Sequence, residues 1–307
     1  MKDLDFRISE IPKLVKLADS LSTIHEYPTG STSRALQAEE IFNKFVLHLT
    51  SFKRNLPKVN EPAIDISVLA SIARMIIEAH NILCYFCETS ASKDEMDFKI
   101  WLYILHYSHD VLAILKKLEF TDADSIVSRF NMSGRMSISC LESNGYFKGL
   151  SEKEQKQLML GHKAVYWRGQ RPKRSPFPKE TEEGIYKLLS NYVHSFPLGN
   201  TMYKGAAPLN HLNFENSAFV IVEVVVSYSA SAILSYCSLR RKLGSRIPAR
   251  EKAYLKDIAT DRPIKEWLCH RREVGIKNNM WGGLRGGFKL QVHHVNFERR
   301  LRVVSGS

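Results

Sequence analysis

The sequence lacks the short motifs that mark several common enzyme classes. It has no G-x-x-x-x-G-K-[ST] phosphate loop, no G-x-G-x-x-G between a strand and a helix, no H-E-x-x-H and no G-x-S-x-G. These absences disfavour P-loop nucleotide hydrolysis, dinucleotide-dependent redox chemistry, zincin proteolysis and the usual esterase chemistry. We therefore expect no cofactor and no bound metal.

Cysteine is also scarce, with five residues scattered along 307. An odd, irregularly spaced set does not form a disulfide framework, which favours a reducing, cytoplasmic location. Cys84 and Cys87 make a C-x-x-C, but they lie inside the apolar run ILCYFC and no second pair completes a zinc site. We expect both to be core thiols, since free cysteine is among the most buried residue types.

The N-terminus has acidic residues from position 3 and no apolar h-region, so no secretory signal is expected. The stretch 217–237 is long enough to span a bilayer, and the basic residues 240–242 follow it. However, Glu223 and five serines lie within this stretch. We predict a buried central helix rather than a membrane span, because the two have similar composition.

Strand-like alternation is nearly absent, and the dominant hydrophobic period is helical. The sequence therefore predicts an all-α, multi-helix domain with a small, glycine-rich, basic C-terminal appendage that could hold a short β-hairpin. Three regions are expected: N-terminal helices (1–60), a helical core domain (61–260) and a basic tail (261–307). The predicted helices are 4–24, 32–54, 63–90, 93–118, 121–131, 151–168, 180–195, 214–243, 248–260 and 263–273. Ser33, Ser92 and Ser151 are the predicted N-caps, the last two in capping boxes, and NMSGR is read as a helix breaker.

Acidic residues are too few to balance the basic ones, which leaves a net charge of +12. Such an excess suits an anionic partner such as RNA. Ten Lys/Arg against three Glu in residues 262–307 supply +7 of it. A loop with three prolines adds a second basic segment beside an aromatic ring, a combination typical of single-stranded nucleic-acid sites. Its predicted binding residues are Trp167, Arg168, Arg171, Lys173 and Arg174; a solvated basic loop is the plainer alternative.

Two helices carry polar groups on otherwise apolar faces. Arg74 and Glu78 are four residues apart and share one face of the helix at 66–87. Ser190 and His194 have the same spacing at the end of a second helix, just before Pro197. A histidine at a helix C-terminus suits proton transfer near neutral pH. Each pair could equally be structural, as a buried ion pair and a helix-end hydrogen bond.

The segments SIARMIIEAHNILCYF, FKIWLYILHYSHDVL and YKLLSNYVHSFP, in this order, resemble a bacterial all-helical family catalogued as a domain of unknown function. That family has an Arg-x-x-x-Glu helix and a Tyr-x-x-Leu-Ser-x-x-x-His helix end, followed by a long apolar helix. The resemblance covers about residues 60–240 and implies a soluble helical fold, without an established activity. The matching positions here are Arg74, Glu78, Tyr186, Leu189, Ser190 and His194.

A HEPN-like, metal-independent ribonuclease is the first functional hypothesis. Enzymes of that type use an Arg and a His four to six residues apart, and five residues separate Arg74 from His80. Six steps along a regular helix nevertheless place these two side chains about 120° apart, and Met75 stands where that family usually has a polar residue. A variant of the hypothesis joins Arg74 and Glu78 to His194 from the other helix.

Two alternatives remain at this stage. His80 with the later His109–Asp110 pair has the order of an HD-type metal phosphohydrolase, although His106 and His109 flank an amphipathic helix and no distal aspartate completes the set. The other alternative is a non-catalytic helical module that binds nucleic acid or protein through its basic segments.

We therefore expect a cytoplasmic bacterial protein of stress or phage defence, a toxin in the HEPN-like case, that acts on or binds RNA. Arg74 would hold a phosphate and Glu78 would orient Arg74. His194, or His80, would transfer the proton, and Ser190 would orient His194. A homodimer is compatible with this interpretation.

Overall fold

A computed structural model describes residues 2–27, 29–56, 66–120, 124–167, 175–194, 208–260, 262 and 264–266. The chain divides into a compact unit, Met1–Asp261, and a second unit, Arg262–Ser307, which falls almost entirely outside the described residues. Within the described ranges all regular structure is helical, so the all-α prediction is confirmed. The proposed C-terminal hairpin and the helix at 267–273 lie outside these ranges.

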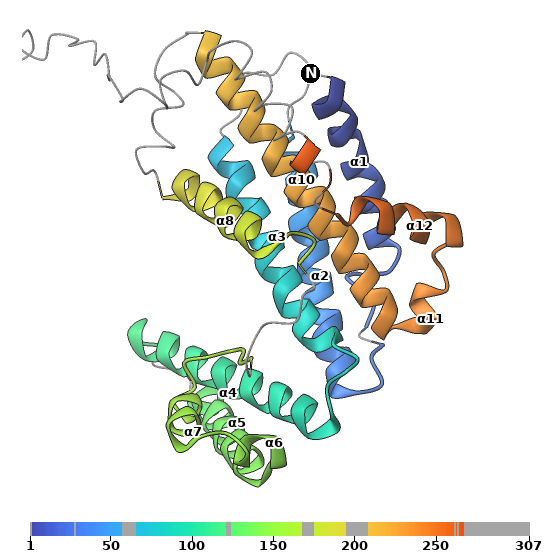
Figure 1. Ribbon diagram of the computed structural model, residues 1–307. Helices are drawn as coiled ribbons and strands as arrows, with labels where there is room; N and C mark the ends of the chain where they lie inside the picture. The colour runs from blue at the N-terminus through green and yellow to red at the C-terminus, as the bar shows by residue number, and fades with distance from the viewer. Residues whose placement is uncertain are drawn as a thin grey trace, which may run out of the picture. The chain divides into compact units, whose positions relative to one another are not determined.

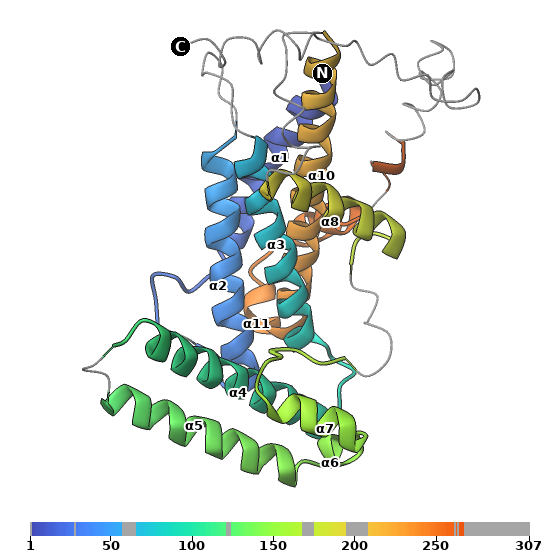
Figure 2. The ribbon, with the colours of Figure 1, turned by 90° about the vertical axis from the view of Figure 1, so that its left-hand side faces the viewer.

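Most of the first unit is a bundle around the long helix α10 (Figures 1 and 2). Helices α1 and α3 pack against α10, α2 packs against α3, and α8 lies along α3 on another side. The bundle helices are α1 (Lys2–Asp19), α2 (Ser33–Arg54), α3 (Ile66–Cys87), α8 (Lys179–Val193), α10 (Pro208–Leu239), α11 (Arg241–Gly244) and α12 (Ala249–Ile258). Their apolar residues recur at helical spacing, so each helix buries one stripe in the shared core.

A second group of helices crosses the end of α2 and α3 (Figure 2). It consists of α4 (Lys93–Lys117), α5 (Asp124–Ser143), α6 (Gly145–Lys148) and α7 (Glu152–Met159). This group has its own small core, made of Phe98, Leu102, Leu105, Leu141, Phe147, Leu150 and Leu158. The core lies where α4 and α5 meet α6 and α7.

Most described side chains of α10 from Ser217 to Ile233 are buried, and the helix is more exposed toward its end. Ser217–Leu239 and Ile66–Cys87 are both long and apolar enough to cross a bilayer, but a core helix of a soluble protein has the same length and composition. Glu223 lies in the buried part of α10 with no solvent exposure, and Arg7 of α1 pairs with it. The pairing offsets the cost of a buried carboxylate.

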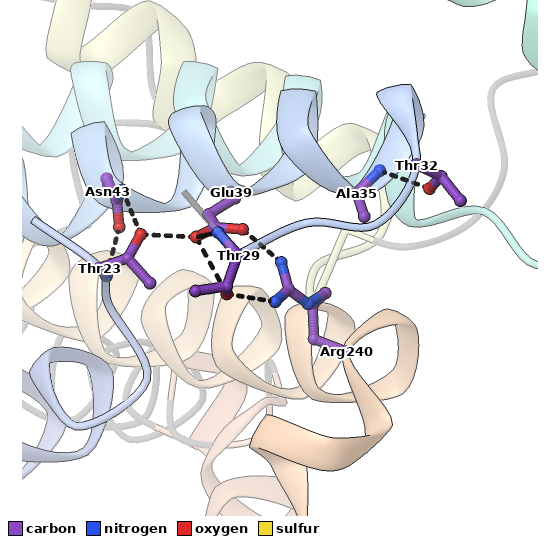
Figure 3. A network of polar contacts seen from close by, with 7 residues as sticks. All are labelled: Thr23, Thr29, Thr32, Ala35, Glu39, Asn43 and Arg240. Atoms are coloured by element: carbon purple, nitrogen blue, oxygen red, sulfur yellow. Dashed lines mark hydrogen bonds and ion pairs between the residues drawn. The ribbon is translucent and has the colours of Figure 1, made fainter. Parts of the chain in front are cut away.

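A second buried ion pair joins α2 to the residue that follows α10 (Figure 3). Glu39 of α2 is fully buried and binds Arg240, which follows α10. The Glu39 carboxylate also accepts hydrogen bonds from the Thr23 hydroxyl at 2.7 Å and the Thr29 backbone N–H at 2.9 Å. Arg240 donates to the Thr29 hydroxyl at 2.6 Å. These bonds anchor the connection between α1 and α2 to the end of α10.

Helix capping largely follows the sequence signals. The capping box of Ser151 and Glu154 is confirmed, with both the side-chain and backbone contacts present. Ser92 caps α4 by accepting a hydrogen bond from a backbone N–H three residues later, as predicted. The predicted cap of α2 is wrong by one residue, because Thr32 rather than Ser33 accepts from the Ala35 N–H.

The prediction that NMSGR breaks a helix is wrong. Helix α5 runs through this segment, which lies against α4. Ser108 of α4 donates to the Ser133 hydroxyl at 3.1 Å, and a Cβ added to Gly134 would lie 3.9 Å from the Cβ of Ser108. Small side chains let the two helices approach closely, so this contact outweighs the low helix propensity of glycine. The predicted helix 151–168 is too long, since α7 ends at Met159.

The C-x-x-C prediction is confirmed. Cys84 and Cys87 are buried on the inward side of α3 and are not joined in a disulfide.

Candidate functional site

The candidate site begins with two charged residues on α3. Arg74 and Glu78 occupy successive turns, and the Nε of Arg74 donates to Oε1 of Glu78 at 3.1 Å. The Arg74 side chain is 25% exposed and that of Glu78 51%, so the pair lies at the surface of the bundle rather than within it. Fourteen of the 22 residues of α3 are buried, most of them apolar, and they fix this helix in the bundle.

Helix α8 brings three further polar side chains to this pair. Tyr186, Ser190 and His194 are spaced by four residues and therefore share one face. The neighbouring face of α8 carries the buried residues Ile185 and Leu189, among others, and α8 packs along α3. Burial of this apolar face turns the polar stripe toward Arg74 and Glu78.

The guanidinium of Arg74 connects all of these groups. Its Nη2 donates to the Tyr186 hydroxyl at 2.7 Å, and the Cζ atom lies 4.6 Å from the centre of the Tyr186 ring. Its Nη1 lies 3.4 Å from Oγ of Ser190 and 3.5 Å from Nε2 of His194. The Tyr186 hydroxyl in turn donates to Oε1 of Glu78 at 3.2 Å. Two strong contacts thus hold one side of the guanidinium, and two weak ones mark the other side.

The hydrogen bonds assign roles to Ser190 and His194. The Ser190 hydroxyl donates to the Tyr186 carbonyl at 2.8 Å, so its oxygen can only accept from Arg74. An arginine has no acceptor atom, so a hydrogen bond between Nη1 and Nε2 of His194 needs the tautomer in which Nε2 accepts. The Ser190 hydroxyl is held by the backbone of its own helix.

The pKa of Arg74 is raised from its usual value. Burial lowers this pKa, but the hydrogen bond and charge of Glu78 and the contact with Tyr186 outweigh burial. The guanidinium is thus a permanent cation with one carboxylate partner. Arg74 thus places a cation beside the imidazole of His194.

His80 lies elsewhere. It is fully buried, with Nε2 2.9 Å from Oγ of Ser231 on α10 and 3.5 Å from Sγ of Cys84, and its ring meets Tyr228 edge-on. Burial lowers the pKa of His80, but nearby Cys84, among other groups, shifts it upward overall. Arg74 faces α8 and His80 faces α10, so the structure does not bring these two predicted residues together.

The histidines of α4 also have partners of their own. Nδ1 of His106 lies 2.8 Å from the Gly161 carbonyl oxygen, and its Nε2 lies 3.2 Å from Asp110. The ring of His109 meets that of His162 edge-on. His80 shares none of these contacts. Among the described residues, no group of three or more His, Cys, Asp or Glu side chains is arranged to hold a metal ion.

The predicted nucleic-acid-binding loop lies outside the described residues at Arg168, Arg171, Lys173 and Arg174. Its flanking residue Trp167 is described. The Trp167 ring meets Tyr85 edge-on at 4.7 Å between centroids, and the buried Nζ of Lys99 lies 5.3 Å from its centre. Trp167 is thus anchored to the protein at the start of the loop.

Tyr186 is the residue that sequence reasoning did not nominate for the site. It matched the family pattern, yet it makes the shortest contact with Arg74. The available signal was its spacing of four from Ser190 and eight from His194, which places all three on one helix face. Asn191 lies three residues before His194, but its side chain donates to the Lys187 carbonyl of its own helix at 2.8 Å.

The chain matches none of the known protein-family models, and comparison with curated proteins and with solved structures finds no match either.

Proposed function

We propose that this protein is a metal-independent, HEPN-like ribonuclease, the effector of a stress or phage-defence system, and that Arg74 and His194 carry its chemistry. The observation that supports the proposal is the partly exposed cluster of Arg74, Glu78, Tyr186, Ser190 and His194, assembled from α3 and α8. Surface ion pairs contribute little to stability, so a five-residue arrangement of this kind is better explained by ligand binding.

The proposed reaction is attack of a ribose 2′-hydroxyl on its adjacent phosphate, which forms a 2′,3′-cyclic phosphate and breaks the bond to the 5′-oxygen of the next nucleotide. The departing 5′-oxygen would take a proton from water. Nε2 of His194 would accept the proton of that hydroxyl, and the guanidinium of Arg74 would stabilise the charge that develops on the phosphate. The weak contacts of Nη1, at 3.4 and 3.5 Å, cost little to exchange for substrate. Glu78 and Tyr186 would keep the guanidinium in place throughout.

The test is cleavage of a 5′-labelled single-stranded RNA by the purified chain in the presence of EDTA. We expect products with 2′,3′-cyclic phosphate ends and no cleavage of the 2′-deoxy analogue. His194→Gln and Arg74→Lys should each lower the rate by about 10²–10⁴-fold. Tyr186→Phe keeps the ring under Arg74 but removes two hydrogen bonds, and should have a smaller effect.

Asn191→Ala is the matched control, because Asn191 lies on the same turn of α8 and bonds only within that helix among the contacts described above. It should cleave like the parent. Inducing the parent in a bacterial host should slow growth and degrade RNA, whereas His194→Gln should do neither. If the folded parent binds RNA without cleaving it, the catalytic proposal is wrong and a nucleic-acid-binding module replaces it.

A further inference from the structure

The α4–α5 helical hairpin ends in a tip that has no core. We define this tip as residues 107–120 and 124–136. Within it only Ser108 is buried, although apolar residues are frequent. Seven large apolar side chains of the tip are between 46% and 65% exposed: Tyr107, Ile114, Leu118, Phe120, Ile126, Met132 and Met136. The other end of the same hairpin is packed against α6 and α7.

Such a surface is unusual for a side of a protein that faces only water. Contiguous exposed apolar surface on a soluble protein marks an interaction site. A pair of helices also gains little stability without a third or fourth helix to cover its apolar face. The tip therefore has the properties of half of a helical bundle.

The spacing of four apolar residues on α4, three of them exposed and Val111 half-buried, identifies the other half of the bundle. Tyr107, Val111, Ile114 and Leu118 are separated by four, three and four residues, which is the a/d spacing of a helix–helix seam. This pattern reads the same in both directions. A second copy of α4, placed antiparallel, would therefore set Tyr107 against Leu118 and Val111 against Ile114.

The charges beside the seam support the same partner. Asp110 and Lys117 occupy equivalent flanking positions, seven residues apart, and both are exposed. In an antiparallel pair of identical helices, residues at this flanking position face each other across the twofold axis. Asp110 of one copy would therefore meet Lys117 of the other, twice by symmetry, so the face is complementary in charge to itself.

We propose that the protein forms a twofold homodimer in which the α4 helices of the two hairpin tips pair antiparallel, centred between Val111 and Ile114. This inference is independent of the ribonuclease proposal, since none of its residues belongs to the Arg74 cluster.

The experiment measures the mass of the purified full-length chain by light scattering after size exclusion, over a dilution series. We expect twice the mass of one chain at high concentration. Ile114→Glu should raise the dimer dissociation constant by about 100-fold or more, because it removes two apolar side chains from the seam. Leu47→Glu is the matched control, since Leu47 on α2 has the same 53% exposure as Ile114 and should leave the dimer unchanged.

Charge reversal at two exposed positions tests the alignment. Asp110→Lys and Lys117→Asp should each weaken the dimer, and the double variant should restore it. A parent that is monomeric at every concentration overturns the proposal. So does a dimer that Ile114→Glu leaves intact, or a double reversal that is weaker than both single ones. Circular dichroism of each variant separates dissociation from unfolding.

Discussion

Replacing Arg240 by methionine should destabilise the protein strongly. Arg240 is the cationic partner of Glu39, a carboxylate with no solvent exposure (Figure 3). Methionine preserves much of the side-chain volume but leaves Glu39 with only neutral donors from Thr23 and Thr29. Breaking one side of a buried ion pair costs about 3–5 kcal/mol, because the remaining charge stays desolvated.

The comparison is with an ion pair of the same type at the surface. Lys179 and Glu183 lie 3.8 Å apart with 83% and 68% exposed side chains. Lys179→Met should therefore cost no more than about 0.5 kcal/mol. Both variants can be measured by urea denaturation followed by circular dichroism at pH 7. The double variant Glu39→Gln, Arg240→Met should recover part of the loss, since no charge is then left buried.

The pH dependence gives a second readout of the same pair. Burial raises the pKa of Glu39, but hydrogen bonds from Thr23 and Thr29 and the charge of Arg240 lower it below its usual 4.5. A carboxylate with a lowered pKa stabilises the folded state above its unfolded pKa, and this stabilisation is lost as the pH falls through the folded pKa. Without Arg240, the buried Glu39 takes up a proton at a higher pH than in the parent, so the gap between the parent and Arg240→Met should narrow as the pH falls below neutral. A cost equal to that of Lys179→Met, or a gap that does not change with pH, refutes this reasoning.

Two further predictions concern the small core and the half-buried thiol of Cys237. Leu141 is fully buried between α5 and its neighbours, so Leu141→Ala should lower the free energy of unfolding by about 2–5 kcal/mol; a loss below 1 kcal/mol, in the same urea assay, would contradict that core. Burial raises the pKa of the Cys237 thiol to about 11, although Lys252 opposes the shift. Alkylation of Cys237 by iodoacetamide, followed by peptide mass spectrometry, should accelerate about tenfold per pH unit up to that value; a plateau near pH 9 would show that the thiol is fully exposed in solution.

The helices were predictable because each carries a local signal. Apolar residues at helical spacing and capping residues place α2, α3, α4 and α8 within a few positions of their observed bounds. The helix through the NMSGR segment was not predictable from the sequence. Glycine has a low intrinsic helix propensity, and only the contact between Gly134 and Ser108 explains the helix there. The pairing of Glu39 with Arg240 was equally out of reach, since 201 residues separate them and neither lies in a motif.

The candidate site was likewise predictable only in its local parts. Arg74 with Glu78, and Ser190 with His194, are each local pairs that a helical wheel identifies. Their union depends on the packing of α8 along α3, which the period of either helix does not specify. Tyr186 was visible as a member of the α8 stripe, but its role follows only from its contact with Arg74.

The choice between the two histidines shows how far a spacing rule can be taken. Counting residues pairs Arg74 with His80, yet six steps of a regular helix turn the second side chain about 120° away from the first. In the structure this rotation takes His80 to Ser231 on the buried side of α3, while Arg74 meets His194 on the exposed side. His80 has no exposed surface, so it would need α3 and α10 to separate before touching a polymer. Helix rotation and burial both favour His194 as the proton acceptor, and a residue count alone would have selected the wrong side of the helix.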